Sequence, residues 1–423
     1  MQYEEALNYI HSFDKFGVKP GLERISALCR ALGNPQKGMR FIHVAGTNGK
    51  GSTSTMLANI CTCAGYRTGL FVSPYVIDFC ERIQIDGSMI PRESLASVMD
   101  DVKKAADAMI DTGETPTEFE IITAAAFLYY RRMQCDVVVL ETGLGGRLDA
   151  TNVIDCPLVN VITSVSLDHT AVLGDTIEAI AAEKCGTLKP GGICVTYPLQ
   201  NAQALRVIRE TCSRQKLRLV LPNVDAVQIL DASIFGTDAV IDGIAVRVPL
   251  LGRHMVYNAS MAVAAAKVLQ SQGLDVSDEC ISRGIARTVM PARMQIVREH
   301  PLVLMDGGHN EDCAVALHSA ITAFLPGRHI VGICGLMADK AYTRYLAHTA
   351  PLFDKLITVR PDNPRALSAQ ALCEAARPFC SDCTASDSFA QAAELALQAA
   401  GKDDVIVVCG SFYMINDLEK YLK

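Results

Sequence analysis

The sequence predicts an α/β protein with an N-terminal parallel-sheet domain over residues 1–294 and a smaller, Rossmann-like α/β domain over 295–423. Short apolar runs alternate with segments of helical periodicity, which is the chain order of parallel α/β folds. Several of these runs end in glycine-rich or polar turns, as strands of open α/β sheets do at their carboxyl ends. A chain of 423 residues is also too long for one ordinary core.

The composition argues against a nucleic-acid-binding protein and against a membrane protein. The formal net charge is −7 and charged residues of both signs make up 20% of the chain, which leaves no basic stripe for nucleic acid. No uninterrupted apolar stretch is long enough to span a bilayer, and the N-terminus lacks the features of a signal peptide. We therefore expect a soluble, cytoplasmic protein without nucleic-acid or membrane partners, and we expect it to act as a monomer.

The 16 cysteines are scattered, and many lie inside apolar segments. This pattern predicts reduced, buried thiols rather than a disulfide scaffold. Cys380 and Cys383 form one CxxC pair, but no second pair follows at the spacing of a zinc site. We interpret the pair as part of a surface loop.

Apolar residues at helical spacing predict the helices of the N-terminal domain, with Gly33 after the second helix and Pro91 at the start of the fourth. The predicted helices cover 3–13, 22–32, 53–64, 91–111, 119–133 and 179–185. Continuous apolar runs are typical of parallel strands buried on both faces. The predicted strands cover 41–45, 67–72, 137–140, 159–163 and 193–196.

Short strand-like runs over 217–250 predict a small β-rich excursion, and helices follow over 257–270 and 278–287. We interpret 291–293 as a linker, because a new series of strands and helices begins after it. The strands of that series are predicted over 302–306, 330–334, 355–359 and 405–409.

The stretch 41–52 has the layout of a phosphate cradle. An apolar run ends in a glycine-rich turn, Gly-Thr-Asn-Gly-Lys-Gly-Ser, which leads into a helix. Backbone N–H groups of such a turn point at phosphate oxygens, Lys50 can reach the β- and γ-phosphates, and Ser52 can face Mg²⁺. Gly51 separates the lysine from the hydroxyl residue, unlike the common P-loop. A plain strand-to-helix turn is the alternative, but strand, loop, lysine, hydroxyl and helix together favour ATP.

Polar residues follow three further strands of the predicted sheet. Ser73, Glu141 and His169 each come after an apolar run, so they should lie at the same edge as the glycine turn. Ser73 and Glu141 offer the oxygen ligands that Mg²⁺ prefers. His169 is a softer ligand that is as often structural, and Asp168 beside it is the rival, with a turn or cap carboxylate as its own alternative.

Two loops are candidates for substrate contact. The glycine-rich segment 141–152 is either a flexible connection or, beside Glu141, a binding loop. Residues 117–120 either cap a helix with acidic residues or meet a heterocycle through Phe119.

The second domain offers fewer candidates. Asp306 opens another glycine turn after a strand, and Arg293 can reach phosphates or can be an ordinary solvated side chain. Ser411 follows the last strand, where it either binds a small carboxylate or caps a helix.

Several motifs, in order along nearly the whole chain, resemble those of folylpolyglutamate synthases and dihydrofolate synthases, in the Mur ligase superfamily. They are AGTNGKGS at 45–52, SPY at 73–75, ERI at 81–83, ETGLGGRLDATN at 141–152, LDHT at 167–170, EKCG at 183–186 and DGGHN at 306–310. The resemblance implies Mur ligase architecture with an N-terminal P-loop-type ATPase domain.

It also implies an ATP-dependent ligase. ATP phosphorylates the carboxylate of dihydropteroate or of a tetrahydrofolate polyglutamate, and the amine of L-glutamate displaces the phosphate. The GGRLDA form of the loop at 145–150 looks more like enzymes with dihydrofolate synthase activity, so a bifunctional enzyme of folate biosynthesis is expected. Two Mg²⁺ ions are implied as cofactors.

The resemblance assigns roles to single residues. Nucleotide contacts are implied for Thr47, Asn48, Gly49, Lys50, Gly51, Ser52, Asn258, Arg293 and Asp306. Ser73, Glu141 and His169 are implied as Mg²⁺ ligands. Substrate contacts are expected at Arg82, Thr117, Glu118, Phe119, Glu120, Leu148, Asp149, Ala150 and Ser411. Lys50, Lys184 and His309 are the catalytic candidates, and Lys184 matches a lysine that is carbamylated in the family to position a second Mg²⁺.

Two departures are small: Cys185 and Gly308 stand where family members commonly have Ala. The alternatives are a folylpolyglutamate synthase without the second activity, a P-loop kinase or NTPase, and a nucleotide-sensing module without catalysis. A cell-wall Mur ligase is disfavoured by the match at 148–150.

Overall fold

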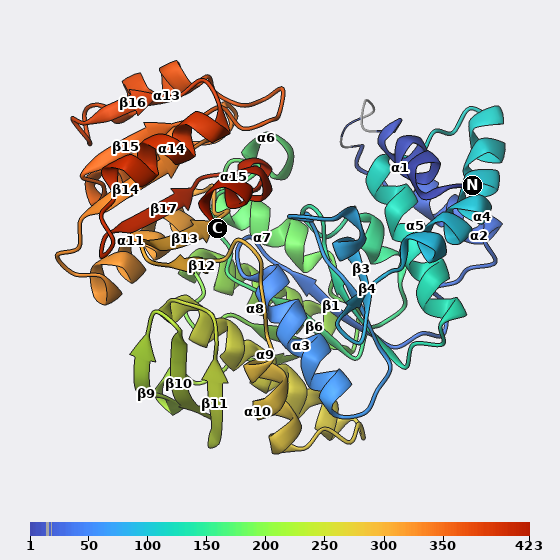
Figure 1. Cartoon of the computed structure of the whole chain (residues 1–423). Helices are drawn as coiled ribbons and strands as arrows, with labels where there is room; N and C mark the ends of the chain where they lie inside the picture. The colour runs from blue at the N-terminus through green and yellow to red at the C-terminus, as the bar shows by residue number, and fades with distance from the viewer. Residues whose placement is uncertain (14–16, 18) are drawn as a thin grey trace. The chain divides into compact units, whose positions relative to one another are not determined.

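The computed structural model describes residues 1–13, 17 and 19–423, and the chain divides into two compact units (Figure 1). Unit 1 comprises Met1–Gln228, Ala239–Arg247 and Tyr257–Thr288. Unit 2 comprises Ile229–Asp238, Val248–Val256 and Val289–Lys423. The domain boundary between residues 294 and 295 stays a prediction.

Unit 1 contains an eight-stranded sheet in the order β4-β3-β2-β5-β1-β6-β7-β8. The six strands from β2 to β8 in this order run parallel, whereas β3 and β4 add an antiparallel edge. The strands are β1 (Phe41–Ala45), β2 (Thr68–Phe71), β3 (Ile83–Ile85), β4 (Ser88–Met89), β5 (Val137–Glu141), β6 (Val159–Ile162), β7 (Ile193–Thr196) and β8 (Arg218–Val220). The central strands β5, β1 and β6 are buried at every residue and mostly apolar, because both faces of the sheet are covered.

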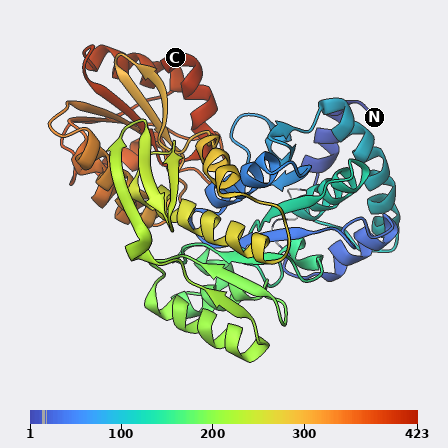
Figure 2. The same cartoon turned by 90° about the horizontal axis from the view of Figure 1, so that it is seen from below.

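The helices of unit 1 cover that sheet. They are α1 (Tyr3–His11), α2 (Glu23–Ala31), α3 (Lys50–Cys63), α4 (Arg92–Asp111), α5 (Glu118–Arg132), α6 (Thr170–Leu173), α7 (Ile177–Cys185), α8 (Ala202–Gln215), α9 (Arg253–Ser271) and α10 (Asp278–Ala286). The first residues of α9 belong to unit 2. Helix α10 packs against α3 (Figures 1 and 2), where a Cβ on Gly284 would lie 2.5 Å from Ile60 Cα. This close approach accounts for a glycine inside α10.

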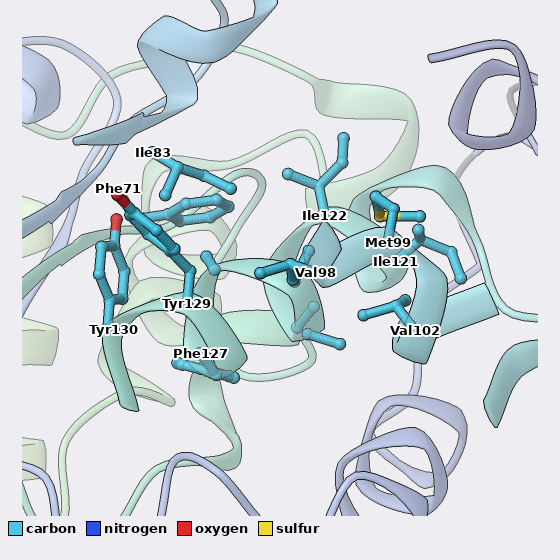
Figure 3. Close-up of a cluster of buried hydrophobic side chains, with 14 of the residues drawn as sticks. Phe71, Ile83, Val98, Met99, Val102, Ile121, Ile122, Phe127, Tyr129 and Tyr130 are labelled. Carbon is cyan, nitrogen blue, oxygen red and sulfur yellow. The ribbon is translucent and has the colours of Figure 1, made fainter. Parts of the chain in front are cut away.

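A large apolar core lies between the sheet and helices α1, α2, α4 and α5. Figure 3 shows side chains of α4 and α5 converging with Phe71 of β2 and Ile83 of β3. The Tyr130 hydroxyl, buried in this core, donates to Leu70 O at 2.6 Å. The burial of this core supplies the main driving force for folding of this half of the unit.

The β-rich excursion predicted over 217–250 is confirmed only in part. Strands β9 (Val227–Ser233), β10 (Gly236–Ile241) and β11 (Ile244–Val248) form a separate three-stranded sheet. However, β8 at 218–220 pairs in parallel with β7 and so belongs to the large sheet. The prediction was wrong there because a run of three residues carries no information about which strand it will pair with.

Unit 2 contains a six-stranded sheet in the order β12-β13-β17-β14-β15-β16. The strands are β12 (Gln295–Glu299), β13 (Leu302–Asp306), β14 (Ile330–Cys334), β15 (Lys355–Thr358), β16 (Cys383–Ala385) and β17 (Val405–Cys409). The helices are α11 (Glu311–Phe324), α12 (Tyr342–Thr349), α13 (Ala369–Ala376), α14 (Phe389–Ala399) and α15 (Ile415–Leu422). All neighbouring strands are parallel except β12, which pairs antiparallel with β13.

The predicted fold class is confirmed, with mixed rather than purely parallel sheets. The segment predicted as a linker is held within unit 2, because Gly307 N donates to Ala292 O at 2.8 Å. Among the described residues, no helix is long and apolar enough to cross a membrane. All 16 cysteines are free thiols, most of them buried, and Cys156 is the exposed one.

Candidate active site

The glycine turn after β1 has the geometry of a phosphate-binding loop. Helix α3 begins at Lys50, earlier than predicted, because Gly49 takes a left-handed conformation (φ 84°) as its N-cap. The first N–H groups of a helix lack partners within the helix and are free for an anion. The Lys50 ammonium folds over the turn and donates to Gly46 O and Thr47 O, both at 3.2 Å. Ser52 is buried in the first turn.

The segment after β6 braces this loop. Thr47 N donates to Ser164 O at 2.8 Å, and Asn48 N donates to the same oxygen at 3.4 Å. The Thr47 hydroxyl donates to Ser166 O at 3.2 Å. These bonds fix the shape of the turn.

Gly49 is required for two reasons. Its positive φ is strained for any residue with a side chain. A Cβ at this position would also lie 2.6 Å from Asn258 Oδ1. The structure therefore brings Asn258, which is buried, against the phosphate loop.

The parallel order β2-β5-β1-β6 confirms that Ser73, Glu141 and the glycine turn follow neighbouring strand ends. Ser73 N donates to Glu141 Oε2 at 3.3 Å, so these two residues are in contact. A buried carboxylate next to a serine residue fits Mg²⁺, which takes one or two protein oxygens together with waters and nucleotide phosphates. In the described part of the chain, no three His, Cys, Asp or Glu side chains are grouped to hold a metal on their own.

His169 lies at the N-terminus of α6 with a left-handed backbone (φ 51°). Its side chain is about half exposed, and Nε2 lies 3.9 Å from Asp168 Oδ1. The Asp168 carboxylate accepts from His169 N at 2.8 Å. Asp168 therefore acts as the turn carboxylate that the sequence analysis gave as its alternative role. That His169, rather than its rival Asp168, binds Mg²⁺ stays a prediction.

Lys184 is a buried lysine on α7 that reaches the phosphate loop. Its Nζ donates to Gly46 O at 2.7 Å. Burial, together with the nearby Lys50 ammonium, lowers the pKa of Lys184 to about 7, while Asp168 and Asp149 oppose the shift. A large fraction of the amine is therefore neutral near neutral pH.

The loop 141–152 is ordered by its own carboxylate rather than being a flexible connection. Asp149 is buried and accepts from Leu144 N at 2.8 Å and from Thr151 N at 3.0 Å. Burial raises the pKa of Asp149, and these hydrogen bonds oppose the rise. Ala150 is buried and Leu148 half-buried. The carboxylate is thus engaged inside the loop, and substrate contact by 148–150 stays a prediction.

Residues 117–120 form a capping box at the start of α5, as the structural alternative predicts. Glu120 N donates to Thr117 Oγ1 at 3.3 Å, and Thr117 N donates to Glu120 Oε2 at 2.7 Å. Glu120 also forms an ion pair with Arg24 at 3.0 Å, and Glu118 lies 3.4 Å from His11 Nδ1.

Phe119 joins the two predicted substrate segments. A Cβ on Gly143 would lie 2.5 Å from Phe119 Cζ, so the ring packs against the 141–152 loop. The guanidinium of Arg82 lies over the rings of Tyr75 and Phe79, at 5.1 and 5.5 Å from their centroids.

The predicted residues of unit 2 gather around the turn after β13. The buried Asp306 carboxylate accepts from Gly308 N at 2.9 Å and from Met294 N at 3.1 Å. Burial raises the pKa of Asp306, against the opposing charge of Arg293. The Arg293 guanidinium lies 4.8 Å from the centroid of the Phe412 ring, and the His309 ring lies 6.3 Å from the same ring.

Ser411 is buried, and its hydroxyl accepts from Tyr413 N at 3.2 Å. This is the capping interaction that the sequence offered as the alternative to carboxylate binding. The Ser411 role in binding stays a prediction.

The sequence interpretation did not single out His43, which is fully buried in β1. Its Nε2 lies 2.8 Å from Thr151 Oγ1, so it contacts the 141–152 loop. One available signal was a histidine in the middle of an otherwise apolar strand, Phe-Ile-His-Val-Ala.

Comparison with known proteins agrees with this geometry. Residues 44–266 match the Mur ligase middle domain, and residues 292–412 match the Mur ligase glutamate ligase domain. Dihydrofolate synthase/folylpolyglutamate synthase of Bacillus subtilis is 37% identical over 100% of this chain and 99% of its own length.

Two solved structures are similar over the whole chain. Mycobacterium tuberculosis folylpolyglutamate synthase complexed with ADP has a TM-score of 0.90 at 28% identity, with coverage of 99% and 98%. E. coli FolC in complex with DHPP and ADP has a TM-score of 0.87 at 30% identity, with coverage of 99% and 97%. The chain belongs to the dihydrofolate synthase/folylpolyglutamate synthase family of Mur ligases.

Proposed function

We propose that this chain is a bifunctional ATP-dependent glutamate ligase that acts on dihydropteroate and on folylpolyglutamates. The γ-phosphoryl group of ATP passes to the carboxylate of the pterin substrate. The amine of L-glutamate then attacks this acyl phosphate, an amide bond forms, and phosphate leaves. The observation that carries the proposal is full-length similarity, at 37% identity, to an enzyme named for both activities.

The phosphate loop supports the nucleotide half of this reaction. We assign the amides at the start of α3 and the Lys50 ammonium to the β- and γ-phosphates, where they stabilise the charge that develops during phosphoryl transfer. Gly49 and Asn258 shape the loop by their close contact.

The contact between Ser73 and Glu141, at the ends of neighbouring strands, supports a magnesium-binding role. Ser73 and Glu141, with His169, would hold Mg²⁺ against the nucleotide. Bound there, Mg²⁺ would offset the repulsion between the substrate carboxylate and the γ-phosphate.

We further propose that Lys184 is carbamylated. A carbamate forms when the neutral amine attacks CO₂ and releases one proton, so a lysine with a pKa of about 7 is well suited to this reaction. The product carries a negative charge beside the loop, where it would position a second Mg²⁺.

The substrate roles are proposed from packing. Phe119 and the 141–152 loop lie in contact, so a pterin held there would meet an aromatic ring and ordered loop amides together. We assign Arg82 to the same substrate. In unit 2 we assign Arg293 and Asp306 to the nucleotide.

His309 is proposed as the catalytic residue of unit 2, and Ser411 as a glutamate contact. Both are buried or half-buried near the Asp306 turn and β17.

The test measures ADP release that depends on L-glutamate. We expect release with dihydropteroate and also with tetrahydrofolate, and we expect little release without an acceptor. The Lys50→Ala variant is the control for contaminating ATPases, and it should lose both activities. ADP release that ignores glutamate would identify an NTPase instead.

A folylpolyglutamate synthase without the second activity is the alternative, since a Lacticaseibacillus casei relative that is 35% identical over 100% of this chain carries only that name. It would release ADP with tetrahydrofolate but not with dihydropteroate. The comparison of the two acceptors separates these possibilities.

A further inference from the structure

His43 is an unusual residue for its place in the fold. It lies in the middle of β1, where all five residues are buried, and its neighbours in register are Leu140 on β5 and Asn160 on β6. A polar ring in such a central strand costs stability unless a hydrogen bond compensates for its lost hydration. The partner of the ring is Thr151 Oγ1, at 2.8 Å.

The direction of this hydrogen bond follows from the hydroxyl group. The Thr151 hydroxyl has one proton and donates it to Asp149 Oδ1 at 2.6 Å. Nε2 of His43 must therefore carry a proton and donate to Thr151 Oγ1. The other ring nitrogen, Nδ1, has no hydrogen-bond partner among the described residues, so a proton there would be a buried donor without an acceptor.

The ring is therefore a neutral imidazole protonated at Nε2. Burial, with a contribution from Lys189, lowers the pKa of His43 to about 3, which agrees with a neutral ring at every physiological pH. The resulting chain of donors runs in one direction, from His43 through Thr151 to Asp149.

Asp149 is the residue that closes the loop. Its Oδ1 accepts from the Thr151 hydroxyl and from Thr151 N, and its Oδ2 accepts from Leu144 N at 2.8 Å. One carboxylate thus ties residues 144 and 151 across the glycine-rich segment. If His43 cannot donate, the Thr151 oxygen keeps a buried lone pair without a donor, and the hydrogen bond that ties this end of the loop to β1 is lost.

Strand β1 also leads directly into the phosphate loop, which begins at Gly46. The same strand therefore anchors the nucleotide loop at its end and the 141–152 loop on its face. Both loops lie in unit 1, so their relation is fixed by one sheet.

We propose that His43 is a positioning residue, which holds the 141–152 loop in its substrate-binding shape by donating from Nε2 to Thr151. This inference rests on the proposed function of that loop. His43 does not touch the reacting groups in this account.

Three substitutions at this position test it. The side-chain nitrogen of Gln can take the place of Nε2, whereas that of Asn falls closer to the place of Nδ1, and Leu removes the donor. We expect His43→Leu and His43→Asn to raise KM for dihydropteroate about tenfold, the effect of one lost buried hydrogen bond, with KM for ATP within about twofold of the parent. His43→Gln should recover most of the loss.

A double mutant tests the link to Thr151. Thr151→Val removes the hydroxyl, and the His43→Leu/Thr151→Val pair should be no worse than the poorer single variant if the two act together. Additive losses would overturn the proposal, as would a fall in Tm for His43→Leu with no change in either KM.

Hydrogen exchange provides a measurement that does not depend on activity. In His43→Leu the amides of Leu144 and Thr151 should exchange faster than in the parent, and nitrogen-15 NMR of the parent should find the His43 ring protonated at Nε2. A ring protonated at Nδ1, or unchanged exchange, would refute the inference. If the parent protein releases no ADP with dihydropteroate and glutamate, the proposed function fails, and these two measurements still decide the role of His43.

Discussion

Glu141 is the residue on which the metal assignment depends. Its buried carboxylate accepts from Ser73 N, and Glu141 is the last residue of β5, at the same sheet edge as the phosphate loop. We expect Glu141→Ala to lower kcat by at least about 100-fold, because several kcal/mol of charge stabilisation are lost, while ATP still binds through the loop amides.

Nucleotide binding and turnover must be measured separately to test this. Calorimetry should give an ATP Kd within a few-fold of the parent, and the ADP assay should give the loss in kcat. A variant that keeps full activity would remove Glu141 from the set of metal ligands.

Lys184 makes the stability of the unmodified protein depend on pH. Its pKa is lowered from 10.5 to about 7 in the folded chain, so between these values the unfolded chain binds more protons than the folded one. The destabilisation is fully present below about pH 7 and disappears as the pH rises toward 10.5. Lys184→Met should therefore stabilise the protein by a few kcal/mol at pH 6 and by much less at pH 10.

Urea unfolding of both proteins across this range, in CO₂-free buffer so that Lys184 stays unmodified, checks the sign. A stabilisation that grows with pH would contradict the buried, uncharged state of the amine. The ligase activity of Lys184→Met should be lost at every pH, because this side chain cannot form a carbamate.

The phosphate loop depends on a backbone shape that only glycine allows at Gly49. We expect Gly49→Ala to raise KM for ATP at least about tenfold, because the methyl group would meet Asn258 Oδ1 at 2.6 Å and the residue would be held at φ 84°. Gly65→Ala is the matched control, since Gly65 has φ 87° but open space around a Cβ. The control should lose about 1 kcal/mol of stability and keep its KM for ATP.

Variants at the N-terminus of α5 can distinguish a capping role of Thr117 from contact with the substrate. Thr117→Ala should destabilise the protein by about 1 kcal/mol through loss of the cap. Ser277→Ala removes an equivalent cap on α10, where Ser277 Oγ accepts from Cys280 N. If Thr117 also contacts the pterin, only its variant should raise KM for dihydropteroate. Equal behaviour of the two variants in the ADP assay would leave Thr117 as a cap alone.

Some elements could be predicted from the sequence and some could not. Strand β17 is an uninterrupted apolar run, β5 is apolar up to its last residue Glu141, and β1 is interrupted only by His43. The phosphate loop is encoded within seven consecutive residues. These strands and this loop were therefore predicted. Strands β8 and β12 are short or half-buried, and helix α8 was not assigned although its charged face is regular. The local sequence pattern predicts an element reliably only where the element is completely buried, or where one continuous stretch supplies all residues of a site.

The contacts that shape the candidate site are long-range. His43 meets Thr151 across 108 positions, and Arg24 meets Glu120 across 96. No local spacing encodes such pairs, because the register between β1 and the loop after β5 arises only when the sheet forms. For this reason the sequence indicated the segments 117–120 and 141–152 as candidate sites, but not the residues that hold them in place.

The chain of the whole molecule passes between the two units several times. Leu251 lies outside the C-terminal domain predicted at 295–423, yet it is buried in the core of unit 2. We expect Leu251→Ala to destabilise unit 2 by about 2–4 kcal/mol, as removal of a large core side chain does. Leu230→Ala is the control, because Leu230 is 65% exposed and belongs to the same unit.

Limited proteolysis locates the effect. In the Leu251→Ala variant, cleavage within 295–423 should become faster, while the Leu230→Ala control should match the parent. If both variants resist protease equally, Leu251 is not a core residue of that unit.

The thiol of Cys156 provides a practical handle on the enzyme. Cys156 is exposed, whereas most other cysteines are buried, so maleimide should label it before the others. Partial desolvation raises the pKa of this thiol, so a mildly alkaline buffer favours the reaction. Cys156 lies only four residues after Asn152, the last residue of the 141–152 loop. A fluorophore attached there would report on ordering of that segment in solution, without any engineered tag.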